Sequence, residues 1–110
     1  MSKILIIEDE ENLRFTLGER LRLEGYEVEL AEDGEIGLEK ARKNPPDLVL
    51  CDIMMPKMDG YKVVELLRQE EHLADLPVIM LTALNQPQQL REGMNVGADD
   101  FLVKPVNKED

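Results

Sequence analysis

Short apolar segments alternate with helical patterns along the chain, and this alternation narrows the choice of folds more than any other property. Lys3–Ile7, Leu48–Cys51 and Pro77–Thr82 are almost entirely apolar, which is typical of strands buried on both faces. Glu27–Ala31 alternates polar and apolar residues, as expected of a strand at a sheet edge, and Phe101–Val103 is a short fifth segment. Strands separated by helices predict an α/β fold, with a five-stranded parallel sheet covered by helices on both faces.

Four helical patterns lie between these segments. The first follows Asn12, where leucines recur every four residues, and Gly25 is expected to end it. Asp33 and Asp59 are predicted to cap the second and third helices. The ranges expected for the second, third and fourth helices are 34–42, 60–70 and 88–95.

Length and composition exclude several classes of protein. The 110 residues fit one small domain, and no apolar run approaches the roughly 20 residues of a membrane span. Met1–Lys3 leads straight into an apolar run, so we expect no secretory leader. The single cysteine, Cys51, excludes an internal disulfide framework. A net charge of −11 argues against direct binding to the backbone of nucleic acids.

Polar side chains follow four of the five predicted strands, at the point where each strand ends. Glu8 and Asp9 follow the first segment, Asp52 the third, Thr82 the fourth and Lys104 the fifth. Because the carboxyl ends of parallel strands meet at one edge of the sheet, these five residues are expected to gather there. Sites in open α/β sheets form at this edge, so it is where we look for a function.

The three carboxylates of this group predict a cation site. Carboxylates held close together repel one another, and a hard divalent cation with oxygen ligands relieves that repulsion. Asp9 and Asp52 are the best candidates for direct ligands of Mg²⁺, for which Mn²⁺ could substitute. Glu8 would act through a bound water, and the backbone carbonyl of Met54 could complete the shell.

Lys104 and Thr82 have a different predicted role, because the charge of a lysine repels a metal ion. An ammonium group and a hydroxyl group suit an anion, such as a phosphoryl group held between them and the metal. Carboxylates can form aspartyl-phosphate intermediates, and positioning with charge stabilisation supplies most of the catalysis in phosphoryl transfer. An ion pair between Lys104 and Asp52 is expected in the resting protein.

Five motifs, in order along the chain, carry a resemblance to a known family. They are Ile6–Glu10, Leu48–Pro56, Met58–Gly60, Leu81–Ala83 and Gly97–Pro105. In these residues the chain resembles the response regulator receiver domain of two-component signalling, and the resemblance covers essentially its whole length. Each motif alone is weak, whereas five in order at this spacing are highly specific.

The resemblance implies a doubly wound sheet of flavodoxin-like strand order 2-1-3-4-5. It also implies a phosphorylation-dependent switch that takes a phosphoryl group from a sensor histidine kinase or a histidine phosphotransfer protein. The implied site residues are Asp52 as phospho-acceptor, Asp9, Asp52 and the Met54 carbonyl as Mg²⁺ ligands with Glu8 assisting, Thr82 and Lys104 as phosphoryl contacts, and Phe101 as an aromatic switch.

The same resemblance implies the activity, the cellular location and the oligomeric state of the domain. Such a domain catalyses its own phosphorylation and dephosphorylation but turns over no independent substrate, so it is not classed as an enzyme. It is expected in the cytoplasm, away from the membrane, with a homodimer as one expected assembly. The face built on the fourth helix and fifth strand would change to control an unknown output.

Two features suggest how the chain differs from a typical family member. The fifth helix of the family is not evident after Lys104–Pro105, so the domain is expected to be cut before that helix, and any effector domain would follow residue 110. In the family, the positions of Met54 and Leu84 flank the path of the hydrolytic water. Neither side chain can hold a water, which predicts slow self-dephosphorylation.

The residues argue against three other functions. An aspartate-based phosphohydrolase needs a second Asp as general acid, but Ile53 and Met54 follow Asp52, so an Asp-x-Asp motif is absent. A flavin-binding protein needs a phosphate-cradling loop, whereas Glu8–Glu11 repels phosphate unless a cation intervenes. A receiver-like domain used only for docking would not need the complete set of acidic, hydroxyl and ammonium groups.

Overall fold

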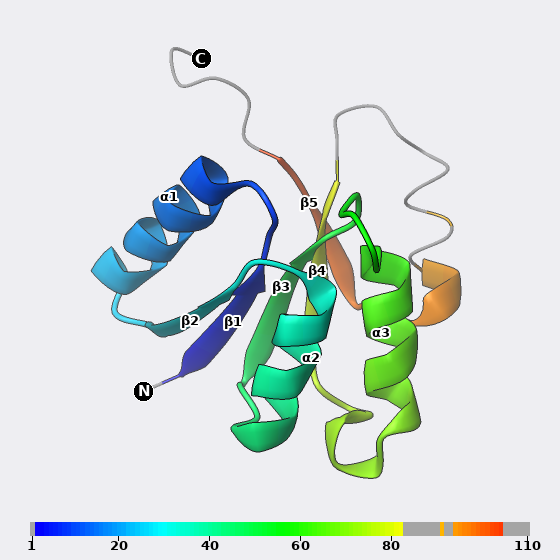
Figure 1. The fold of residues 1–110 in the computed structure, drawn as a ribbon. Coiled ribbons are helices and arrows are strands. Elements are labelled where there is room, and N and C mark those ends of the chain that lie inside the picture. The colour runs from blue at the N-terminus through cyan, green and yellow to red at the C-terminus, as the bar shows by residue number, and fades with distance from the viewer. Residues whose placement is uncertain (1, 83–90, 92–93, 105–110) are drawn as a thin grey trace.

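The computed structural model describes residues 2–82, 91 and 94–104 of the chain. One five-stranded sheet forms its centre, with strand order β2-β1-β3-β4-β5 and every neighbouring pair parallel (Figure 1). Both the strand order and the parallel direction confirm the prediction. The strands are β1 (Lys3–Ile7), β2 (Glu27–Ala31), β3 (Leu48–Asp52), β4 (Val78–Thr82) and β5 (Asp100–Val103).

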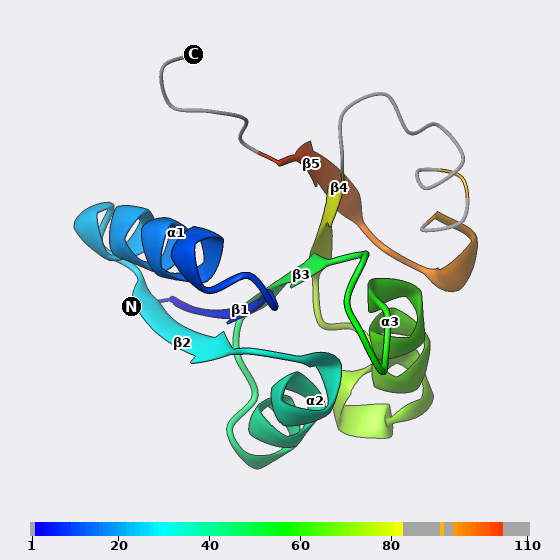
Figure 2. The same ribbon diagram turned by 45° about the horizontal axis from the view of Figure 1, so that its top comes forward.

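Helices cover both faces of the sheet, as predicted for a doubly wound fold. Helix α1 (Glu11–Leu23) lies on one face, while α2 (Gly34–Lys43) and α3 (Gly60–Gln69) lie on the other (Figure 2). The predicted caps are confirmed, because Asp33 accepts a hydrogen bond from the Ile36 amide and Asp59 accepts one from the Lys62 amide. Gly25 follows the last turn of α1 with a positive φ of 99°, which glycine adopts without strain.

One short helix differs from the prediction, and two predicted segments lie wholly or mostly outside the described residues. A short 3₁₀ helix, η1 (Glu71–Leu73), was not predicted; it buries Leu73 in the core. Most of the helix expected over 88–95 lies outside the described residues, although Arg91 and 94–96 are helical. The segment after Lys104, where the fifth helix would begin, also lies outside them.

The core has two parts, one on each face of the sheet. On the larger side, Val63, Val64 and Leu67 of α3 are fully buried against the central strands, as their helical spacing predicts. On the other side, Leu17 and Leu21 of α1 pack against a smaller cluster that includes Ile6 and Leu81. Packing of the helices therefore fixes the strands relative to one another. This also fixes the positions of the residues that follow the strands.

Side chains of the flanking helices occupy main-chain acceptors on the outer strand β2. The Lys40 ammonium donates to the Leu30 carbonyl, and the Arg22 guanidinium approaches the Val28 carbonyl at 3.4 Å. Lys3 of the neighbouring strand pairs with Glu29 at 3.2 Å. This edge of the sheet is therefore partly covered by charged groups.

Arg68, near the end of α3, connects three segments at the amino-terminal side of the sheet. Its guanidinium donates to the Gly97 carbonyl at 2.7 and 3.1 Å and to the Asp99 carboxylate at 3.0 Å. Two further bonds reach the carbonyls of Ala74 and Leu76, at 3.1 and 2.7 Å. Arg68 thus fixes the segment that leads into β5. Sequence reasoning did not identify this role.

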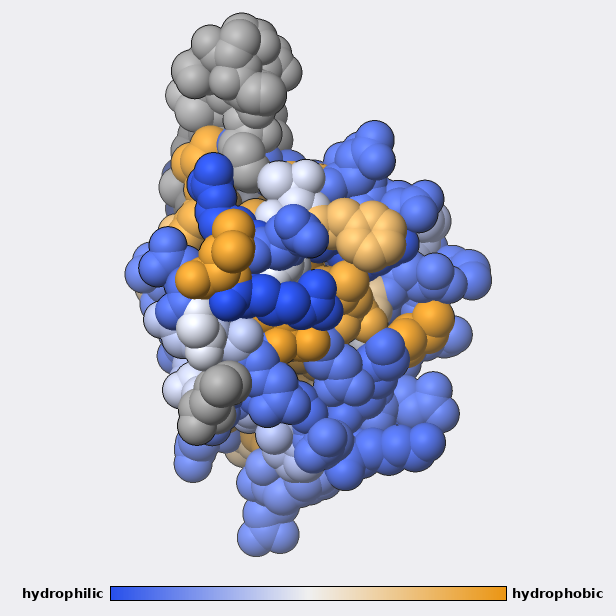
Figure 3. Space-filling model, turned by 90° about the vertical axis from the view of Figure 1, so that its left-hand side faces the viewer, coloured by the Kyte–Doolittle hydropathy of each residue, from blue (hydrophilic) through white to orange (hydrophobic). Residues whose placement is uncertain are grey.

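The surface on the side of α1 is mostly hydrophilic (Figure 3). Apolar side chains gather near the middle of this view. Two residues of α1, Phe15 and Leu23, are 51% and 86% exposed. Within the described residues, the structure has no helix of the length and apolarity needed to span a membrane.

Candidate functional site

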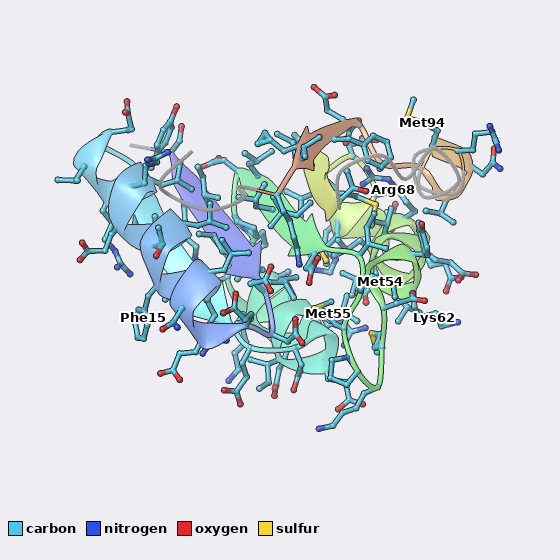
Figure 4. All side chains as sticks on the ribbon, turned by 90° about the horizontal axis from the view of Figure 1, so that it is seen from above. Phe15, Met54, Met55, Lys62, Arg68 and Met94 are labelled. Carbon is cyan, nitrogen blue, oxygen red and sulfur yellow. The ribbon has the colours of Figure 1, made fainter. Side chains whose placement is uncertain are left out.

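The carboxyl ends of the strands bring the predicted polar residues together at one edge of the sheet, the edge seen in Figure 4. Glu8 directly follows β1, Asp52 is the last residue of β3, and Thr82 is the last residue of β4. One ligand atom from each of Glu8, Asp9 and Asp52 lies within 4.8 Å of the others. The grouping of these carboxylates confirms the prediction.

Lys104 enters the group from the end of β5. Its ammonium lies 3.1 Å from Asp52 Oδ1 and 3.9 Å from Glu8 Oε1. The Lys104 amide donates to the Thr82 carbonyl at 2.8 Å, so β4 holds the lysine backbone in place. The expected resting ion pair between Lys104 and Asp52 is therefore confirmed. Thr82 itself is 3% exposed, at the same edge.

Two carboxylate oxygens in this site are buried without a hydrogen bond. Glu8 is fully buried and Asp52 is 1% exposed, yet Glu8 Oε1 and Asp52 Oδ2 have no hydrogen-bond partner. The second Glu8 oxygen accepts from the Glu10 amide at 3.0 Å. A buried anionic oxygen without a partner is costly, and a cation would satisfy both oxygens. The hard oxygen donors of this group suit a divalent metal ion such as Mg²⁺.

Burial and mutual repulsion change the titration of these groups. Burial, with the charge of Asp52, raises the pKa of Glu8 from 4.5 to about 7. Burial, with the charge of Asp9, also raises the pKa of Asp52, although Lys104 opposes the change. Burial lowers the pKa of Lys104, but its hydrogen bond to Asp52 and the nearby carboxylates outweigh this and leave the pKa raised. Burial and mutual repulsion thus disfavour the ionised carboxylates, and a bound cation would offset both effects.

The raised pKa of Glu8 predicts that the metal-free protein loses stability as pH rises. Below pH 4.5 the carboxyl is protonated in both folded and unfolded states, so its contribution is fully present. Between pH 4.5 and about 7 the unfolded state ionises first, and we expect the free energy of unfolding to fall by on the order of 2 to 3 kcal/mol from this group. Chemical denaturation at pH 5 and pH 8 without divalent ions measures the change.

Glu8→Gln should remove most of that pH dependence, because the amide does not titrate. The exposed Glu24→Gln is the matched control and should retain the wild-type slope. An equal slope in Glu8→Gln and wild type would show that Glu8 is not the group responsible.

The loop after Asp52 depends on a close approach that only glycine allows. A Cβ atom on Gly60, the first residue of α3, would lie 2.3 Å from the Asp52 carbonyl oxygen. The Gly60 amide also donates to the Ile53 carbonyl at 2.8 Å. The start of α3 therefore supports the backbone of Asp52 directly. Gly60 belongs to a motif noted in the sequence, but this contact could not be foreseen there.

The remaining predicted residues are placed as follows. Met54 lies in the loop after β3, at this edge of the sheet, with its side chain 66% exposed (Figure 4). Phe101 pairs with Met80 in the register of β4 and β5 and packs, half-buried, against the larger core. Cys51 is fully buried, and burial raises the pKa of its thiol, so it is an apolar core residue. Leu84 lies outside the described residues.

Comparison with known proteins gives consistent matches in sequence. A model of the response regulator receiver domain family matches residues 4–110. The DNA-binding dual master transcriptional regulator RpaA of Synechocystis is 44% identical over 110 residues, which are all of this chain and 46% of that protein. The transcriptional regulatory protein RprY of Bacteroides fragilis is 42% identical over 108 residues, 98% of this chain and 45% of that protein. The chain spans less than half the length of these relatives.

Solved structures agree with the sequence matches. The chemotaxis protein CheY4 of Vibrio cholerae superimposes with a TM-score of 0.91 at 38% identity, covering 99% of this chain and 91% of that one. The receiver domain of the Francisella response regulator 1452 gives a TM-score of 0.86 at 30% identity, covering 97% and 87% of the two chains.

Proposed function

This chain belongs to the response regulator receiver domain family, and on that basis we propose that it is a signalling switch phosphorylated on Asp52. The observation that carries the proposal is the state of the Asp52 carboxylate. One of its oxygens is paired with Lys104 at 3.1 Å, while the other is buried without a hydrogen bond beside two further carboxylates. A carboxylate beside an ammonium and a group of further carboxylates suits an aspartyl nucleophile with a neighbouring cation, which supports the proposal.

In the proposed reaction, a carboxylate oxygen of Asp52 attacks the phosphorus atom of a phosphohistidine on the donor. The new oxygen–phosphorus bond forms as the bond between phosphorus and the imidazole nitrogen breaks. That nitrogen leaves with the electron pair and takes up a proton. Lys104 and Thr82 stabilise the charge that develops on the phosphoryl oxygens, which is the main source of rate enhancement in such transfers.

The metal would be held by Asp9, Asp52 and the Met54 carbonyl, with Glu8 acting through a bound water. Mg²⁺, when bound, supplies positive charge that offsets repulsion between the carboxylates and the incoming phosphoryl group. Two buried oxygens that accept no hydrogen bond, Glu8 Oε1 and Asp52 Oδ2, support the choice of a hard cation for this site. Mn²⁺ is the expected substitute.

Phosphorylation would be transmitted through β4 and β5. Thr82 would move toward the phosphoryl group, and Phe101 would turn inward as the neighbouring surface rearranges. The donor would be a sensor histidine kinase or a histidine phosphotransfer protein. RpaA and RprY are transcriptional regulators more than twice the length of this chain, so we propose an effector domain after residue 110 as the output.

The proposal is tested by incubating the purified chain with a small acyl phosphate and Mg²⁺. Intact mass should increase by one phosphoryl group per chain, and the label should map to the peptide that contains Asp52. Chelation with EDTA should prevent uptake, and Mn²⁺ should restore it. Uptake that is insensitive to EDTA, or a label at another residue, would contradict the proposed site.

The phosphorylated state is expected to persist, because the exposed Met54 cannot orient a hydrolytic water. We expect a half-life of minutes or longer in Mg²⁺, measured by the decay of the phosphorylated mass. Met54→Asn introduces an amide at this position and should shorten the half-life, whereas the equally apolar Met54→Leu should leave it unchanged. A wild-type half-life of seconds would refute the prediction.

A further inference from the structure

Arg14, at the end of the first turn of α1, contacts the main chain of the acidic site. Its Nη1 donates to the main-chain carbonyl of Glu8 at 2.8 Å, and the side chain is half-buried. This carbonyl belongs to the peptide unit that joins Glu8 to Asp9. Because a peptide unit is planar, a hydrogen bond to its oxygen also fixes the direction in which the chain enters Asp9.

The residues on either side of that peptide unit are held to different degrees. The Glu8 amide donates to the Ala31 carbonyl at 3.0 Å, and the Glu8 side chain is fully buried. Asp9 is exposed, so surrounding side chains constrain it much less. The hydrogen bond from Arg14 therefore restrains the backbone between a buried carboxylate, Glu8, and an exposed one, Asp9.

We propose that Arg14 is a positioning residue for the cation site: by fixing the Glu8–Asp9 peptide unit, it keeps the Asp9 carboxylate within reach of Glu8 and Asp52. This inference rests on the proposed metal site. It assigns Arg14 no contact with the metal or the phosphoryl group. Groups that orient metal ligands from outside the coordination shell commonly change metal affinity tenfold or more when they are removed.

Positioning and simple charge make opposite predictions for this residue. Arg14 carries a positive charge next to a site for a cation, so its charge alone weakens binding of a divalent ion. If charge were its only effect, Arg14→Ala would bind Mg²⁺ more tightly than the wild type. If Arg14 positions Asp9, Arg14→Ala would bind Mg²⁺ more weakly despite the favourable change in charge.

The experiment is titration of the metal-free full chain with Mg²⁺ by calorimetry, at a temperature where each variant is folded. We expect Arg14→Ala to weaken Mg²⁺ binding about tenfold, and Arg14→Lys to give an intermediate affinity. Arg20→Ala is the control: it removes the same charge from an exposed position on the same helix and should not weaken binding. Unchanged or tighter binding by Arg14→Ala would overturn the proposal.

Two other results, the absence of Mg²⁺ binding by the wild type and the failure of Arg14→Ala to fold, have different meanings. If the wild type binds no Mg²⁺, the proposed metal site itself fails, whatever Arg14 does. If Arg14→Ala does not fold, Arg14→Lys decides: weaker binding than the wild type supports positioning, and wild-type affinity overturns it. The affinity is measured on folded protein without any phosphodonor, so a general loss of stability does not imitate the effect.

Discussion

Asp52→Asn is expected to abolish phosphoryl uptake completely. Asparagine has nearly the same volume as aspartate, so it should fit the 1% exposed position at the end of β3 without disturbing the core. Its amide, however, is a poor nucleophile and carries no charge for a cation or for Lys104. Intact mass after incubation with an acyl phosphate and Mg²⁺ should show no added phosphoryl group.

The control for this variant is Asp75→Asn, which changes an exposed aspartate before β4, away from the site. It should take up phosphate like the wild type. Chemical denaturation should show that Asp52→Asn is folded, and it should be no less stable than the wild type at neutral pH, since the change removes one of three crowded negative charges. Equal labelling of Asp52→Asn and wild type would remove Asp52 as the acceptor.

Arg68→Ala is expected to cause the largest loss of stability among surface-accessible positions of α3. The substitution leaves the carbonyls of Gly97 and Leu76 without the charged donor that they now share. The ion pair with Asp99, whose side chain is 55% exposed, should contribute little by itself. We expect a loss of about 4 kcal/mol, most of it from the carbonyl groups, which is a large fraction of the stability of a small domain.

Arg42→Ala provides the comparison, because Arg42 also lies near the end of a helix and pairs with Glu70 across the surface. With 47% of its side chain exposed and one carboxylate partner, this pair should be worth less than about 1 kcal/mol. Urea denaturation of both variants measures the difference. Similar losses for Arg68→Ala and Arg42→Ala would mean that the carbonyl contacts of Arg68 are not what stabilises the segment leading into β5.

The parts of the fold that follow local rules could be predicted from the sequence. The apolar segments became β1, β3 and β4, and the alternating segment became the edge strand β2. Asp33 and Asp59 cap helices because a short carboxylate side chain can reach the free amides of the first turn. The convergence of Glu8, Asp52 and Lys104 followed from the parallel direction of the strands alone.

Features that depend on distances between remote segments could not be predicted in this way. The helix η1 is too short to show a period, and its position depends on the burial of Leu73. Arg68 looks like any solvated arginine at the end of a helix until the fold brings Gly97 and Asp99 to it. The two carboxylate oxygens of Glu8 and Asp52 that accept no hydrogen bond depend on side-chain geometry that no spacing of residues encodes.

The charged groups along β2 have a consequence for proteins crowded together at high concentration. A sheet grows sideways when the free edge of one molecule offers open acceptors and donors to a strand of another. A strand from a second molecule would first have to displace Lys40 from the Leu30 carbonyl and Arg22 from the Val28 carbonyl. Its backbone would then lie beside the negative charges of Glu27 and Glu29. The free edge of β2 is thereby protected against aggregation in which strands of successive molecules pair into a fibre.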